Sequence, residues 1–130
     1  MTNLLLTNNP MVLRKYPKSE KITGSLRDVF IKARNYIHQD YQLLMHPLSG
    51  SIKPNISPYK SLLLQRNNDF NSKDYSSTIL IEEAFTALNK FEPVCLSESN
   101  PVLEDFQLVD LSLLESALGS IVSLEKSFIT

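Results

Sequence analysis

The chain has 130 residues, of which 42% are hydrophobic, with 13 Lys or Arg against 14 Asp or Glu and a formal net charge of −1. This composition is typical of a folded globular protein and excludes a disordered chain. The length fits one domain over residues 1–130. The small net charge hides an uneven distribution, because residues 1–66 hold ten basic and three acidic residues whereas residues 67–130 hold three basic and eleven acidic ones.

Apolar runs, helical periodicity and turn residues predict the elements. In chain order we expect a strand at 4–6, a helical turn at 11–16, a weak strand at 21–23, a helix at 26–39, strands at 42–45 and 61–65, and helices at 78–91 and 110–127. Ser25 is a good N-cap for the first long helix, with Asp28 completing a capping box. Asp110 has the residue type of an N-cap for the last helix.

The alternation of strands and helices predicts an α/β fold. Short apolar strands without polar alternation favour a mostly parallel sheet of about four strands, with helices on both faces, as in a small Rossmann-like three-layer sandwich. Ligands of such sheets bind beyond the carboxyl ends of the strands. Those ends carry Thr7, Asn8 and Asn9 after the first strand and the segment that begins at His46 after the third.

The segment 46–61 contains three prolines, two lysines and four serines. Prolines restrict the backbone, so this long loop is stiff and its donors are ordered before a ligand arrives. Hydroxyls, a glycine and a lysine over 49–53 have the composition of an anion-binding nest, although the phosphate-binding GxxxxGK[ST] and GxGxxG motifs are absent. The expected ligand-binding residues are Thr7, Asn8, Asn9, Ser49, Gly50, Ser51, Lys53, Asn55, Tyr59 and Lys60. The alternative is a structural loop whose polar groups satisfy one another.

His46 is the one candidate catalytic residue. It has the chemistry of a general base, with Ser49 or Ser51 as its nucleophile, but no GxSxG elbow accompanies it and no acid is placed to orient it. A structural histidine at a strand end is the alternative interpretation. The sequence therefore leaves open whether the protein is an enzyme.

The cysteine content, the apolar runs and the placement of basic residues predict the compartment and exclude several classes of partner. Cys95 is a lone cysteine, and no Cys/His cluster has the spacing of a zinc site, so we expect no disulfide, metal or cofactor. The N-terminus has no basic region before an apolar run, and no run approaches the ~18 apolar residues of a membrane span. The basic residues are not interleaved with aromatic ones as in nucleic-acid-binding motifs. We expect a cytoplasmic protein that contacts neither a membrane nor nucleic acid.

Several segments together resemble one known family. The segments that resemble the GrdX family are Leu-Leu-Leu-Thr-Asn-Asn-Pro at 4–10, Gly-Ser-Leu-Arg-Asp-Val at 24–29, Leu-Leu-Met-His-Pro-Leu-Ser-Gly-Ser-Ile-Lys-Pro-Asn at 43–55 and Ser-Pro-Tyr-Lys-Ser at 57–61. The resemblance covers roughly the first two-thirds of the chain. The family is encoded alongside the glycine, sarcosine and betaine reductase components of amino-acid-fermenting anaerobes, and its own activity is unestablished.

The resemblance implies an accessory protein of that reductase system, with reductase components as its partners. The residues favour a binding protein for a small anion, such as a phosphate ester or the carboxylate of an amino acid derivative. The alternative function is a small enzyme that uses His46 as acid or base on such a compound. The broad apolar face of the predicted helix 110–127 suggests an interface, for which a homodimer is one arrangement.

Overall fold

The computed structural model describes residues 2–49, 56–66, 75–92 and 96–121. The strands are β1 (Thr2–Thr7), β2 (Glu20–Lys21), β3 (Tyr41–Leu43) and β4 (Ser61–Arg66). The helices are α1 (Pro10–Lys15), α2 (Leu26–Ile37), α3 (Ser76–Asn89) and α4 (Val102–Ser120). The predicted α/β class is confirmed, and each predicted element is present with ends displaced by a few residues, except the last helix. That helix starts earlier than predicted, and its predicted end at 127 lies outside the described residues.

The four strands form one sheet in the order β2-β1-β4-β3. Only the short β1–β2 pair is parallel, while β4 is antiparallel to both β1 and β3. The predicted mostly parallel, Rossmann-like sheet is therefore wrong. A parallel pair needs a crossover connection, usually a helix, and no predicted helix separates the third and fourth strands. The sheet is mixed, with mostly antiparallel pairing.

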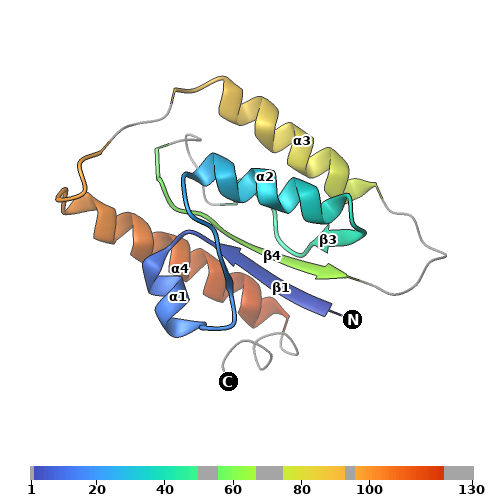
Figure 1. Ribbon diagram of the computed structural model, residues 1–130, viewed down its shortest axis with the longest axis horizontal. Coiled ribbons are helices and arrows are strands. Elements are labelled where there is room, and N and C mark those ends of the chain that lie inside the picture. Colours follow the sequence, from blue (N-terminus) through green and yellow to red (C-terminus); the bar gives the residue numbers. More distant parts are fainter. Residues whose placement is uncertain (1, 50–55, 67–74, 93–95, 122–130) are drawn as a thin grey trace.

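Helices cover both faces of this sheet (Figure 1), with α2 and α3 on one side and α1 and α4 on the other. Successive side chains of a strand point to opposite faces. Leu6 and Leu64 thus pack with α2 and α3, whereas Leu5 and Leu63 pack with α1 and α4. Burial on both faces explains why the leucine runs of β1 and β4 show no polar alternation.

The helix α2 begins as the sequence predicts. The Ser25 side chain accepts a hydrogen bond from the Asp28 N–H, and the Asp28 carboxylate accepts one from the Ser25 N–H at 2.7 Å, which completes the capping box. The α2 helix is joined to α3 by Arg34, which pairs with Glu82 at 2.8 Å and lies 3.7 Å from the centre of the Phe85 ring. The capping box fixes the start of α2, and the Arg34 contacts fix how α2 packs against α3.

The helix α4 starts eight residues before the predicted position, directly after Pro101. Asp110, the predicted N-cap, lies in the middle of this helix and is buried. Its carboxylate accepts hydrogen bonds from Ser61 and Asn9 across the interface with the sheet rather than from its own helix. The expected cap is therefore wrong, because the polar residue that interrupts the apolar pattern is satisfied by tertiary partners.

The apolar face of α4 is directed mainly at the sheet. Leu114 and Leu118 are buried in the cluster with Leu5 and Leu63, while Leu108 and Val109 remain 55% and 54% exposed. The homodimer interface expected for this helix stays a prediction. Within the described ranges, none of the helices combines the length and the apolarity needed to cross a membrane.

Candidate functional site

The polar residues of the candidate site meet where β1 ends and β4 begins. Thr7 is paired directly with Ser61 in the antiparallel ladder, so the carboxyl end of β1 and the amino end of β4 lie at the same edge of the sheet. The chain after β3 reaches this edge too, because the Leu44 N–H donates to the Leu63 carbonyl. The sequence predicted that Asn8 and Asn9 meet the segment that begins at His46. The described contacts instead join Asn8 to the end of the long loop, and antiparallel pairing of β1 with β4 produces them.

Four buried residues at this edge form a hydrogen-bond chain, which we call the Asp110 network: Thr7, Asn9, Ser61 and Asp110. Asp110 accepts from the Ser61 N–H at 3.0 Å, from the Ser61 hydroxyl at 2.7 Å and from Asn9 Nδ2 at 3.0 Å. Because a carboxylate only accepts, the Ser61 hydrogen is committed to Asp110, and Thr7 must donate to Ser61 Oγ across 2.7 Å. The Asn9 N–H then donates to Thr7 Oγ1 at 3.0 Å. The hydroxyl donors of Thr7 and Ser61 are thereby aligned in one direction, which ends at the Asp110 carboxylate.

Asn8 joins three separate segments through its side-chain amide. Its Nδ2 donates to the carbonyls of Pro58 at 2.8 Å and Gly24 at 3.1 Å, and its Oδ1 accepts from the Lys60 N–H at 2.8 Å. Asn9 is engaged in a similar way, since its Oδ1 caps α1 by accepting from the Met11 N–H. Both amides therefore hold backbone in place, a role closer to positioning than to direct ligand contact.

Lys60 is the unusual residue of this edge. It is only 4% exposed, although lysine is almost never fully buried without a charged partner. In the part of the chain that the structure describes, its ammonium forms no ion pair. Burial lowers the pKa of Lys60 below its usual value, and the charge of nearby Asp110 opposes that effect without cancelling it. The result is a desolvated amine beside a rigid polar network.

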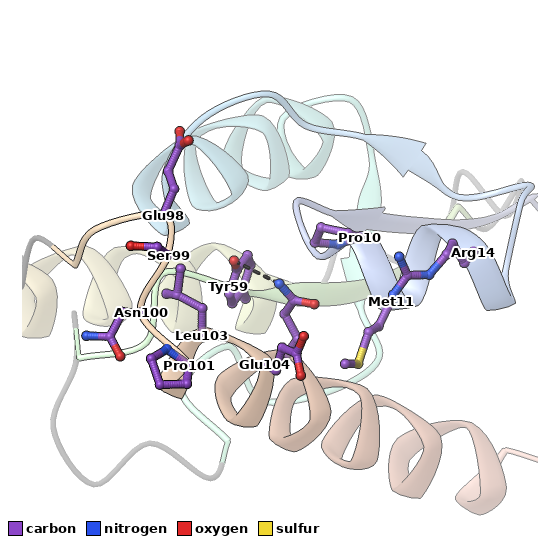
Figure 2. A pocket seen from close by; sticks show the side chains of 11 residues that line it. Pro10, Met11, Arg14, Tyr59, Glu98, Ser99, Asn100, Pro101, Leu103 and Glu104 are labelled. Carbon is purple, nitrogen blue, oxygen red and sulfur yellow. Dashed lines mark hydrogen bonds between the residues drawn. The ribbon is translucent and has the colours of Figure 1, made fainter.

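Tyr59, which precedes Lys60, lines a cavity of about 540 Å³ between α1, the segment before α4 and the first turns of α4 (Figure 2). Its hydroxyl accepts a hydrogen bond from Gln107 Nε2 at 2.9 Å. The backbone carbonyl of Gln107 in turn accepts from Asn9 Nδ2 at 2.9 Å. Asn9 therefore connects the Asp110 network to Gln107, which lines the cavity.

A comparison with protein-family models matches residues 4–119 to the family described as GrdX-like protein. The chain belongs to the GrdX-like protein family. The match extends through α4 and so includes Ser61 and Asp110 as well as the segments that carry the sequence resemblance. No curated protein and no solved structure matches the chain significantly.

His46 lies on the exposed surface after β3. Its Nδ1 accepts a hydrogen bond from the Leu48 N–H at 3.1 Å, and its carbonyl accepts one from the Ser49 N–H at 3.0 Å. The two side chains of the proposed base and nucleophile, His46 and Ser49, form no hydrogen bond with each other. A base role for Nδ1 would require the bond from Leu48 to break.

The remaining predicted ligand residues, Gly50, Ser51, Lys53 and Asn55, lie outside the described residues. Among the residues that the structure does describe, no three His, Cys, Asp or Glu side chains are grouped closely enough to hold a metal ion. Sequence reasoning missed Ser61 and Asp110 as members of the candidate site. A polar residue interrupting the apolar stripe of a long helix is the signal that points to Asp110.

Proposed function

We propose that this GrdX-like protein is an accessory binding protein of a glycine, sarcosine or betaine reductase system, and that it holds a small anion at the sheet edge beside Lys60. Membership of the family supports the setting. The observation that supports the ligand's negative charge is the burial of Lys60, whose ammonium has no ion-pair partner among the described residues.

A bound anion would form an ion pair with the Lys60 ammonium, which no described residue does. Asp110 already accepts three hydrogen bonds from Ser61 and Asn9, which partly satisfies its own charge. Opposite charges interact more strongly in a buried, low-dielectric environment than in water. Charge-assisted hydrogen bonds to a carboxylate or phosphate are also among the strongest available. A bound anion would therefore offset the energetic cost of burying the charged Lys60 and would raise its pKa.

The edge is ordered before any ligand arrives. Asn8 fixes the backbone of Pro58 and Lys60, and the Asp110 network fixes the start of β4. Ordering donors in advance reduces the entropic cost of binding. This supports a binding role ahead of the alternative, a small enzyme with His46 as acid or base, because His46 is exposed and its described hydrogen bonds are to neighbouring loop backbone.

A thermal-melt experiment tests the binding proposal, with inorganic phosphate, acetate and glycine as probes. We expect at least one of these three compounds, each of which carries an anionic group at neutral pH, to raise the melting temperature of the unaltered protein and to leave that of Lys60→Met unchanged. A ligand at a hundredfold excess over its Kd stabilises the fold by about 2.7 kcal/mol, so the shift is measurable. Lys90→Met is the matched control, because Lys90 is an exposed lysine at the end of α3 and should respond as the unaltered protein does.

Equal shifts in the unaltered protein and in Lys60→Met would contradict the proposal, as would no shift with any of the three probes. Circular dichroism establishes that Lys60→Met is folded. For the reductase setting, the expected result is co-elution with a purified reductase component in size-exclusion chromatography. Separate elution from every component would contradict that part.

A further inference from the structure

The cavity of about 540 Å³ beside Tyr59 is not used by the function proposed above, because Lys60 does not line it. Its walls come from α1, from the segment preceding α4 and from the first turns of α4 (Figure 2). Its volume lies in the range of small-molecule sites, which is roughly 300–1,000 Å³. The cavity therefore has room for a ligand larger than a single small amino acid.

The floor of the cavity is a fixed pair of neutral polar side chains. The Tyr59 hydroxyl accepts from Gln107 Nε2 at 2.9 Å, so its own hydrogen remains available to donate to a ligand. Gln107 is held in turn through its carbonyl by Asn9, a member of the Asp110 network. A ligand would thus meet a hydroxyl and an amide whose positions are set by the buried network.

Opposite charges line different walls of the same cavity. Arg14 extends from α1 into the cavity toward Tyr59, and Glu104 lies on the α4 wall, whereas the Glu98 carboxylate is directed away from both at the rim (Figure 2). All three charged side chains are exposed. Among the described residues, neither Arg14 nor these two glutamates forms an ion pair. A guanidinium and carboxylates that share a cavity without pairing leave both signs of charge available to a ligand.

We propose that this cavity binds a zwitterion of dipeptide size. The ligand carboxylate is held by Arg14, whose planar guanidinium suits bidentate recognition of carboxylates, and by the Tyr59 hydroxyl. The ligand ammonium faces Glu104 on the opposite wall. Four apolar residues offer contacts to the rest of the ligand: Pro10, Met11, Pro101 and Leu103.

Isothermal titration with the dipeptide Gly-Leu and two blocked forms tests this assignment. The N-acetylated form lacks the ammonium and the C-terminal amide lacks the carboxylate. We expect Gly-Leu to bind the unaltered protein at least tenfold more tightly than either blocked form. Arg14→Gln should bind Gly-Leu and its amide with equal affinity, and Glu104→Gln should no longer distinguish Gly-Leu from its acetylated form.

Matched controls are Arg66→Gln, which removes a positive charge at the opposite end of β4, and Glu83→Gln, which removes a negative charge on α3. Both should bind as the unaltered protein does. The proposal is overturned if Gly-Leu does not bind, if it and its blocked forms bind equally, or if Arg14→Gln leaves the affinity unchanged. Lys60→Met separates the two sites: loss of Gly-Leu binding in that variant but not in Arg14→Gln would place the dipeptide beside Lys60 and refute the zwitterion cavity.

Discussion

Asp110, midway along α4, accepts two hydrogen bonds from Ser61, the first residue of β4: one from the backbone N–H at 3.0 Å and one from the hydroxyl at 2.7 Å. The same carboxylate accepts from Asn9 just after β1. One side chain from the acidic half of the chain thus holds the ends of two strands from the basic half. The candidate site depends on both halves, so α4 is a part of the site's support as well as a cover for the sheet.

Asp110→Asn tests this support. The substitution replaces an acceptor oxygen by an NH₂ group that meets donors from Ser61 or Asn9, so buried hydrogen bonds to a charged group are lost. We expect the free energy of unfolding, measured in urea, to fall by about 3 kcal/mol. Asp105→Asn, at an exposed position of the same helix, should change it by less than about 0.5 kcal/mol. Similar values for the two variants would show that the Asp110 network does not fix α4.

The buried amine of Lys60 predicts a pH dependence of stability. Its pKa is lowered in the folded protein, so between that lowered pKa and the ordinary value near 10.5 the unfolded chain binds more protons. The contribution of Lys60 to stability therefore becomes more favourable as the pH rises through this window. We expect Lys60→Met to gain most over the unaltered protein at neutral pH and to lose that advantage toward about pH 10.

Urea unfolding at a series of pH values measures this difference. Lys90→Met, which removes an exposed lysine, should differ from the unaltered protein by an amount that does not vary with pH. If the advantage of Lys60→Met is constant or grows with pH, the Lys60 amine is not desolvated as the structure indicates.

Tyr36 supplies a second titration that is independent of the site. Its hydroxyl donates to Glu20 Oε1 at 2.5 Å, and this bond raises the pKa of Tyr36 to about 12, with burial adding to the effect. Because the folded pKa is raised above the ordinary value near 10, the stabilisation is complete below about pH 10 and is lost as the pH rises toward 12.

Glu20→Gln removes the charged acceptor, so Tyr36 should ionise at a lower pH in that variant. The ultraviolet absorbance of tyrosinate follows this ionisation, and Tyr36→Phe identifies which step of the titration belongs to Tyr36. Glu83→Gln serves as the control for loss of an exposed carboxylate elsewhere. An identical tyrosine titration in Glu20→Gln and in the unaltered protein would contradict the assigned hydrogen bond.

The start of α2 and the burial of β1 and β4 were predicted correctly, because each depends on a pattern within a few neighbouring residues. Ser25 and Asp28 indicate the start of α2 because a capping box depends on residues three positions apart. The leucine runs of β1 and β4 indicate strands buried on both faces. Strand direction was predicted wrongly, because a run of leucines has the same appearance in a parallel strand and in an antiparallel strand that helices cover on both faces.

The role of Asp110 depends on a contact that no local pattern contains. Asp is a common N-cap, but Ser61, its principal partner, lies 49 positions earlier in the chain. The sequence placed both Asn8 and Lys60 among the ligand-binding residues, but the hydrogen bonds that join them depend on the antiparallel pairing of β1 with β4, which was not predicted. The burial of Lys60 could not be read from the sequence, since it depends on tertiary packing around the start of β4.

The most direct test of the anion proposal is the pKa of Lys60 itself, measured by NMR of its ¹⁵N-labelled Nζ with and without saturating inorganic phosphate or acetate. Lys60→Met identifies the resonance. The account predicts a lowered pKa in the free protein that rises when an anion is bound, because the anion replaces the missing counter-charge. A pKa of Lys60 that is the same with and without both anions would contradict it.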